Sequence, residues 1–373
     1  MHDSLFRLLY QKNVTVHQYF DHFNFLDHSK AILVVGPMGS GKTEYARRVW
    51  KDSQVARRKS QYIAECTSTG SRDRRRVIYC RSALDLSRFE QYPKDMLVSR
   101  AGVERMGDEL VITRNSFDIE SLIDRNSQVG TWIIDEAGFY DDRLAFVIEH
   151  AITTTQSNFV LPTLLLNFRN QLFNKTTELL ISRASDIYLF TAYCEHPNCL
   201  SASHCTYRYY MIDGKECPAP YFDPLILIGG DKKSGLQTVP NYETRCEAHH
   251  YLPAMNYCYL FLKPAAVQAS SGYPETLLKE FEFVVNDIEN SELYSSVVQE
   301  SMSKGQEILL NSLNVPLLAE RMLLYLYLEL QLLSEDMFIS IVRRFSLQED
   351  YLHKRFAENS LRQMPLGLET SSF

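Results

Sequence analysis

The chain has 373 residues, of which 45% are hydrophobic and 23% are charged, which is typical of a globular protein. This length exceeds what one hydrophobic core usually supports, so two or three domains are expected. The formal net charge of -7 argues against non-specific binding of nucleic acid by the whole surface, and no nucleic-acid partner is predicted.

The first 30 residues predict a short helical extension, with Leu5, Leu8 and Leu9 at helical spacing. Residues 1–28 carry scattered Asp, Lys and His and no clean apolar core, so no signal peptide is expected. A cytoplasmic location and the absence of a membrane partner are therefore predicted. The extension could pack on the next domain or mediate assembly.

Residues 31–35, AILVV, form a short apolar run that predicts a buried strand. The next eight residues fit the motif G-x-x-x-x-G-K-[ST], which binds phosphate through backbone N–H groups and the N-terminus of the following helix. The alternative, a chance glycine turn, is disfavoured by the complete motif between a strand and a helix. The expected ATP-binding residues of this loop are Gly36, Pro37, Met38, Gly39, Ser40, Gly41, Lys42 and Thr43.

Two side chains of this motif have expected roles of their own. Lys42 would reach the β- and γ-phosphates, and the Thr43 hydroxyl would hold Mg²⁺. A helix is expected to follow from residue 44 to residue 50.

Residues 56–76 contain the basic runs ARRKS and RDRRR. They could form a phosphate-facing loop, but a solvated, mobile insertion is the favoured interpretation. Strands are predicted at residues 77–80 and 96–98.

The second chemical centre is residues 131–142, TWIIDEAGFYDD, in which an apolar strand ends in Asp135 and Glu136. In proteins with a phosphate-binding loop, an acid at such a strand end serves the metal ion, here Asp135. The adjacent Glu136 could act as a base towards a hydroxyl or a water. A surface turn is the alternative.

The motifs together resemble the type II thymidine kinases. Residues 36–43 are similar to the family loop G-P-M-x-S-G-K-[ST], and the resemblance covers about residues 31–255. The other matches, in chain order, are residues 135–139 (DEAGF), 165–173 (LLNFRNQLF), Cys194 with Cys199, 206–208 (TYR), 225–230 (LILIGG), and Tyr242 four residues before Cys246.

The resemblance implies an ATP-dependent kinase that phosphorylates the 5′-hydroxyl of a deoxynucleoside, thymidine first, by in-line transfer. It implies that Glu136 is the general base, that Asp135 serves Mg²⁺, and that Phe168 stacks on the base; core packing is the alternative for Phe168. The other implied nucleoside-binding residues are Met38, the lasso residues Leu225, Ile226, Leu227, Ile228 and Gly229, and Tyr242, which would close the lasso.

Six of the eight cysteines lie between residues 194 and 258, and in a cytosolic protein such clustering favours a metal site over disulfides. By resemblance, a zinc ribbon anchors the lasso, with Cys194, Cys199, Cys246 and His249 as ligands of structural Zn²⁺. Unligated, reduced thiols are the alternative, and His196, Cys205 and Cys217 are further candidates. The lasso segments are expected to meet only through this metal.

Four departures from the family pattern affect function. The first ligand pair is C-x4-C where the family usually has C-x2-C, and the fourth ligand is a histidine. Gly138 replaces the family's glutamine after D-E-x, which removes a side chain near the nucleotide. An insertion, DKKSGLQTVPN, interrupts the lasso between Gly230 and Tyr242.

Residues 264–373 lie outside the resemblance and predict a helical bundle. Apolar residues between 277 and 288 recur at helical spacing, and a second run begins at Pro316. Ser346 and Glu349 form a capping-box pattern before a third helix. The bundle could cover the site, drive assembly or bind a partner.

The predicted fold class is α/β: a P-loop parallel sheet flanked by helices, a small zinc-ribbon lasso domain and a helical C-terminal domain. The expected domains are residues 1–30, 31–191, 192–262 and 263–373. The predicted partners are ATP and a deoxynucleoside, and the family implies a homo-oligomer, either a dimer or a tetramer. The alternative function is a P-loop ATPase or nucleotide-sensing protein without nucleoside kinase activity.

Overall fold

The computed structural model describes most of the chain, namely Phe23 and residues 28–59, 72–86, 92–99, 102–227 and 237–359. The predicted N-terminal helix with Leu5, Leu8 and Leu9 lies outside the described residues, as do Ile228 and Gly229 of the lasso.

A six-stranded parallel sheet forms the centre of the N-terminal half, as the sequence predicts. Three of its strands are buried along their whole length, because helices cover both faces of a parallel sheet. In order across the sheet, the strands are β5 (Leu110–Thr113), β2 (Asp73–Ser82), β6 (Val129–Ile134), β7 (Asn158–Leu164), β1 (Ala31–Gly36) and β8 (Asp186–Leu189).

The side chains of β1 alternate between two hydrophobic cores. Ile32 and Val34 pack in the core that includes α2, whereas Leu33 and Val35 pack in the core that includes α5, α6 and α7. The helices of this half are α2 (Lys42–Lys59), α4 (Ala83–Leu86), α5 (Ser116–Arg125), α6 (Arg143–Thr155) and α7 (Lys175–Arg183), with 3₁₀ turns at Gly107–Glu109 (η2) and Ala137–Phe139 (η3).

The predicted strands at residues 77–80 and 96–98 are both confirmed, but the second does not join the central sheet. Met96–Ser99 (β3) pairs with Gly102–Arg105 (β4) in a separate antiparallel hairpin. Among the described residues of the basic stretch, Arg74 and Arg75 are buried at the start of β2. The strands from β2 to β1 are parallel, so the start of β2 lies at the N-terminal ends of the strands, whereas the phosphate loop lies at their C-terminal ends. These two arginines therefore do not face phosphate.

A smaller antiparallel layer follows the central sheet along the chain. Its central strand, β11, pairs with β12 on one side and with β13 on the other. The chain segments before and after the lasso, β11 and β13, are therefore joined by backbone hydrogen bonds. The prediction that the lasso segments meet only through a metal is wrong. The strands are β9 (Ala192–Tyr193), β10 (Ala202–Ser203), β11 (Cys205–Ile212), β12 (Lys215–Pro218) and β13 (Asn241–Arg245), followed by the 3₁₀ turn η4 (Glu247–His249).

The C-terminal residues form a helical layer, as predicted. Ser346, however, adopts a left-handed conformation that ends α13 and does not cap α14. The elements are α8 (Met255–Tyr257), π-helical η5 (Cys258–Leu262), α9 (Lys263–Ser270), α10 (Glu275–Asn286), η6 (Ile288–Asn290), α11 (Glu292–Lys304), η7 (Glu307–Asn314), α12 (Leu318–Leu324), π-helical η8 (Tyr325–Glu329), α13 (Glu335–Phe345) and α14 (Glu349–Asn359).

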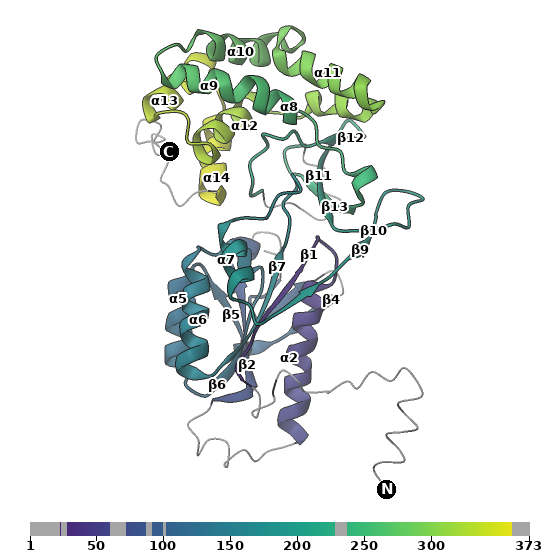
Figure 1. Cartoon of the computed structure of the whole chain (residues 1–373). Helices are drawn as coiled ribbons and strands as arrows, with labels where there is room; N and C mark the ends of the chain where they lie inside the picture. Colours follow the sequence, from purple (N-terminus) through teal and green to yellow (C-terminus); the bar gives the residue numbers. More distant parts are fainter. Residues whose placement is uncertain are drawn as a thin grey trace.

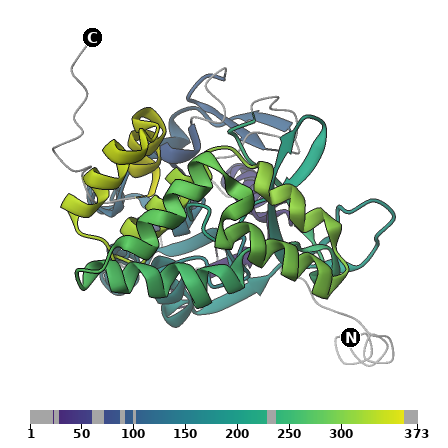
Figure 2. The ribbon, with the colours of Figure 1, turned by 90° about the horizontal axis from the view of Figure 1, so that it is seen from above.

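One hydrophobic core joins the helical layer to the antiparallel layer. Tyr210, Phe222 and Leu227 belong to the same buried cluster as Phe281 and Leu323 of the helices. The helical layer lies above β11, β12 and β13, and the central sheet lies below them (Figure 1). Seen from above, these helices extend across the rest of the molecule (Figure 2). None of the helices in the described part of the chain is long and apolar enough to cross a membrane.

Candidate active site

The phosphate-binding motif forms a tight loop between β1 and α2. Gly39 and Gly41 have φ angles of 75° and 90°, which only glycine adopts readily. The Nζ atom of Lys42 donates hydrogen bonds to the carbonyl oxygens of Gly36, at 3.0 Å, and Pro37, at 2.7 Å. The loop thus curls around the ammonium group at the N-terminus of α2, where a helix attracts anions.

Thr43 and Asp135, the two residues predicted to bind Mg²⁺, lie side by side at the ends of neighbouring elements. The Thr43 hydroxyl donates to Oδ1 of Asp135 at 3.5 Å, and the Tyr79 hydroxyl donates to Oδ2 at 2.6 Å. Asp135 directly follows β6, and Thr43 stands in the first turn of α2. A hydroxyl and a carboxylate are hard oxygen ligands, so this pair fits Mg²⁺.

Glu136 occupies a turn in which its backbone is left-handed, with φ 51° and ψ 45°. A side chain other than glycine pays on the order of 1–2 kcal/mol for this conformation. The Phe139 amide donates to the Glu136 carbonyl at 2.8 Å and fixes the turn. Glu136 lines a cavity next to the phosphate loop. A strained turn that directs an acid towards a cavity is typical of a functional position.

The cavity has an empty volume of about 630 Å³, part of which is open to solvent. Two distant parts of the chain build it, the ends of the central strands and the start of the lasso. The predicted site residues that line it are Met38, Glu136, Phe168, Leu225, Ile226, Leu227 and Tyr242.

Phe168 is buried against a charged partner at the wall of this cavity. The guanidinium of Arg208 lies 3.9 Å from the centroid of the Phe168 ring. Arg208 also donates to Asp223 Oδ2 at 2.9 Å and to the carbonyl oxygens of Pro224, at 2.5 Å, and Leu225, at 2.7 Å. One arginine therefore fixes both the aromatic ring and the first residues of the lasso.

The carboxylate of Asp223 stays ionised although it is completely buried. Burial alone would raise its pKa, but the adjacent guanidinium groups of Arg321 and Arg208 hold the pKa below its ordinary value. The Tyr210 hydroxyl adds a hydrogen bond to Oδ2 at 2.9 Å. The segment that begins the lasso is thus fixed by charge-assisted hydrogen bonds in a dry environment.

Two hydrogen bonds link β13 to the other parts of the site. The Tyr242 hydroxyl donates to the Leu227 carbonyl at 2.6 Å, so Tyr242 contacts the lasso segment that it is expected to close. The Thr244 hydroxyl donates to the carbonyl of Met38 in the phosphate loop. The lasso and the phosphate loop are therefore in direct contact.

Sequence reasoning missed several residues of the cavity wall, above all Thr206 and Arg208. Both lie on β11, where alternate side chains point to the same face, so residues 206 and 208 face the cavity together. Tyr207 points to the other face and stacks on Tyr209. The motif TYR would have indicated this position if residues 205–212 had been predicted as a strand, because its first and third residues then share one face. The other residues missed are Leu84, Phe139, Leu164, Asn167 and Phe173.

Gly138 is surrounded so closely that no larger residue fits. A Cβ atom here would lie 2.6 Å from Thr163 Oγ1, 2.8 Å from Phe173 Cδ1 and 2.9 Å from Thr177 Oγ1. The Gly138 amide donates to Thr163 Oγ1 at 3.0 Å, and its carbonyl accepts from Asn174 at 2.6 Å. Packing against β7 and α7 thus explains why this chain has glycine at the position.

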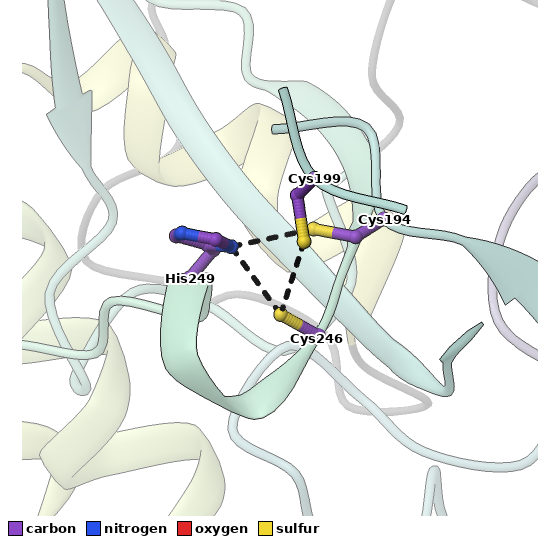
Figure 3. A group of neighbouring side chains, drawn as sticks. All are labelled: Cys194, Cys199, Cys246 and His249. Atoms are coloured by element: carbon purple, nitrogen blue, oxygen red, sulfur yellow. Dashed lines mark hydrogen bonds between the residues drawn. The ribbon is translucent and has the colours of Figure 1, made fainter. Parts of the chain in front are cut away.

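The four predicted metal ligands come together at one point (Figure 3). Their ligand atoms all lie within 4.8 Å of one another, and they come from the segments around β9 and β13. Nδ1 of His249 is 3.3 Å from Cys246 Sγ and 3.7 Å from Cys194 Sγ, and the sulfurs of Cys199 and Cys246 are 3.9 Å apart. This Cys₃His group could hold a metal ion.

The pKa values of the group shift in different directions, and burial raises the pKa of the Cys246 thiol. Burial, followed by the nearby charges of His196 and Arg245, lowers the pKa of His249, which keeps the imidazole neutral. Hydrogen bonds from Ser201 lower the pKa of Cys199 to about 7, which favours the thiolate. His196 stacks on the His249 ring at 3.8 Å, whereas Cys205 and Cys217 are buried outside the group.

Comparison with known protein families agrees with this site. The family model described as thymidine kinase matches residues 29–250, which include the phosphate loop, the cavity residues and the Cys₃His group. The match covers more than half of the 373 residues. The chain therefore belongs to the thymidine kinase family.

Proposed function

We propose that this protein is an ATP-dependent deoxynucleoside kinase that transfers the γ-phosphate of ATP to the 5′-hydroxyl of thymidine and forms dTMP. The observation that carries the proposal is the position of Glu136. Glu136 lines the same cavity as Met38 of the phosphate loop and Phe168, so an acceptor bound there would have a base and a phosphate donor beside it.

In this proposal, ATP occupies the loop of residues 36–43, and Lys42 neutralises charge on its β- and γ-phosphates. Thr43 and Asp135 would hold Mg²⁺, which supplies further charge neutralisation when bound. Glu136 takes the proton from the 5′-hydroxyl as the hydroxyl oxygen attacks the γ-phosphorus. The protein otherwise contributes alignment of donor and acceptor.

The nucleoside base would lie against Phe168 and under the lasso. Phe168 offers an aromatic face, and the lasso residues Leu225, Ile226 and Leu227 line the same cavity, where a pyrimidine edge would lie. The Thr206 hydroxyl is buried on the same wall and has no hydrogen-bond partner among the described residues, so it is available to a polar group of the base. Ile228 and Gly229 would extend the lasso.

The Cys₃His group would hold structural Zn²⁺. Three thiolates and one imidazole in a closed set are typical of structural zinc sites. Such an ion would connect the segment before β10 to the end of β13 and thereby fix the end of the lasso.

The proposal is tested with a panel of radiolabelled deoxynucleosides, ATP and Mg²⁺, beside a measurement of ATP hydrolysis without acceptor. We expect thymidine to be phosphorylated fastest and acceptor-free hydrolysis to be slow. Hydrolysis without any nucleoside phosphorylation would contradict the proposal and favour the alternative, an ATPase or nucleotide-sensing protein on the same scaffold.

A further inference from the structure

The helical layer beyond the family match reaches the wall of the nucleoside cavity with two charged side chains. They are Arg321 of α12 and Glu329, the last residue of the π-helical turn η8. Both contact residues 223–225, the segment that begins the lasso.

Glu329 bridges the two sides of the cavity wall. Its carboxylate accepts hydrogen bonds from Arg169 Nη1 at 2.5 Å and from Arg169 Nη2 at 3.0 Å, in a bidentate pair. Its Oε1 atom also accepts from the backbone amide of Leu225 at 3.1 Å. Leu225 lines the cavity, and Arg169 follows Phe168, which lines it too. One carboxylate therefore fixes the lasso relative to the aromatic ring.

Arg169 depends on this carboxylate because it is buried. Only 4% of its side chain is exposed, and its guanidinium lies among the rings of Phe168, Tyr221 and Tyr325, 5.0 to 5.1 Å from their centroids. Its Nη2 atom also donates to the carbonyl of Asp223 at 2.7 Å. Tyr325 belongs to the same π-helical turn as Glu329, so the helical layer supplies both a ring and the countercharge.

Arg321 fixes the same segment from the other side. It is completely buried, donates to Asp223 Oδ1, and donates to the Tyr210 hydroxyl at 2.6 Å. Its Nε atom bonds to the Pro316 carbonyl at 2.8 Å, which ties the guanidinium to the start of α12. Asp223 is thus clamped between Arg321 of the helical layer and Arg208 of β11.

We propose that Glu329 and Arg321 are positioning residues through which the C-terminal helical layer sets the affinity for the nucleoside. The inference rests on the proposed nucleoside kinase function. The helical layer makes the nucleoside half of the site rigid before the substrate binds, which lowers the ordering cost of binding. Within the described part of the chain, Arg321 and Glu329 form no hydrogen bond or ion pair with the phosphate loop, so we expect the affinity for ATP to depend little on this layer.

The test is Glu329→Gln, with steady-state KM and kcat measured separately for thymidine and for ATP. Glutamine keeps the shape and one oxygen for the Leu225 amide, but it removes the charge that faces Arg169. We expect the thymidine KM to rise roughly ten- to a hundredfold, because the lasso must then be ordered when the nucleoside binds. The ATP KM should change little.

The matched control is Glu320→Gln in the same layer. Glu320 is also buried, and it accepts a backbone hydrogen bond from Gln348 inside the layer. An unchanged thymidine KM in Glu329→Gln would overturn the inference. An equal rise in Glu320→Gln would also overturn it, since the effect would then be general destabilisation.

If Glu329→Gln does not fold, Glu329→Asp decides, because aspartate keeps the charge but is too short to span Arg169 and the Leu225 amide together. A raised thymidine KM with an unchanged ATP KM supports the inference, and wild-type values for both contradict it. Failure of the proposed function is distinct, because the wild-type protein would then phosphorylate no nucleoside at all.

Discussion

At the scale of single residues, the proposed chemistry depends on Glu136. The sequence indicated this acid from its place after an apolar strand, and the structure adds the left-handed turn and the cavity beside it. For Glu136→Gln we expect kcat to fall on the order of 10²- to 10⁴-fold, the usual contribution of a positioned base. Rapid-mix kinetics with saturating thymidine and ATP measure this.

Binding of ATP is the internal control for that variant. The phosphate loop is untouched, so the ATP dissociation constant should stay at its wild-type value. Turnover close to that of the wild-type protein would exclude Glu136 as the base.

For Gly138, the sequence and the structure suggest different reasons why the residue is a glycine. The family comparison of motifs suggested a lost side chain near the nucleotide, whereas the structure gives a packing reason for glycine. Gly138→Ala should destabilise the fold by about 1–3 kcal/mol, because the new methyl group has no space and must displace Thr163, Phe173 or Thr177. Denaturant unfolding measures this, and stability equal to wild type would show that the position has free space.

At the scale of elements, the β11–β13 ladder connects the segments around the lasso, and the Cys₃His group would add a second connection if it binds a metal ion. If the group binds zinc, purified protein should contain about one zinc ion per chain, and Cys246→Ser should lose it because a hydroxyl is a poor ligand for structural zinc. The thymidine KM should rise while ATP affinity stays constant. Metal analysis and the two KM values check this.

Cys217→Ser is the matched control for the metal variant. Cys217 is buried in the same layer, and its sulfur bonds to the Lys215 carbonyl, a contact that serine can keep. The control should retain zinc. If protein prepared without chelators contained no zinc, the zinc assignment would fail, and the group would be a set of reduced thiols.

Local sequence signals were sufficient for the phosphate loop and for the strand that ends in Asp135, since each is indicated by adjacent residues. The four ligands of the metal group, by contrast, were predicted from the family resemblance. The position of Thr206 and Arg208 on the cavity wall was missed, because it depends on which side chains of β11 point towards the cavity. The pairing of β11 with β13 was also missed, since no apolar run marks it.

At the scale of the whole molecule, the sequence predicted the C-terminal helices but not what they cover. Arg169 and Glu329 are 160 residues apart in the chain, and Asp223 and Arg321 are 98 apart. No pattern within one segment reveals such pairs, because each charged residue alone is typical of a solvated surface. The structure shows instead that the helical layer shares a core with the antiparallel layer beneath it.

The division into domains and the state of assembly remain predictions. The boundary expected at residue 262 lies where η5 continues directly into α9, and the shared core spans it. Homo-oligomers, whether dimers or tetramers, and a cytoplasmic location are expected from the family resemblance and the sequence.

The measurement that tests the central claim most directly is the fate of the γ-phosphate of labelled ATP in the presence of thymidine. We expect the label to appear in dTMP, with one ADP formed for each dTMP, and Glu136→Gln to slow this transfer. Label that appears only as inorganic phosphate, at a rate independent of thymidine, would contradict the account.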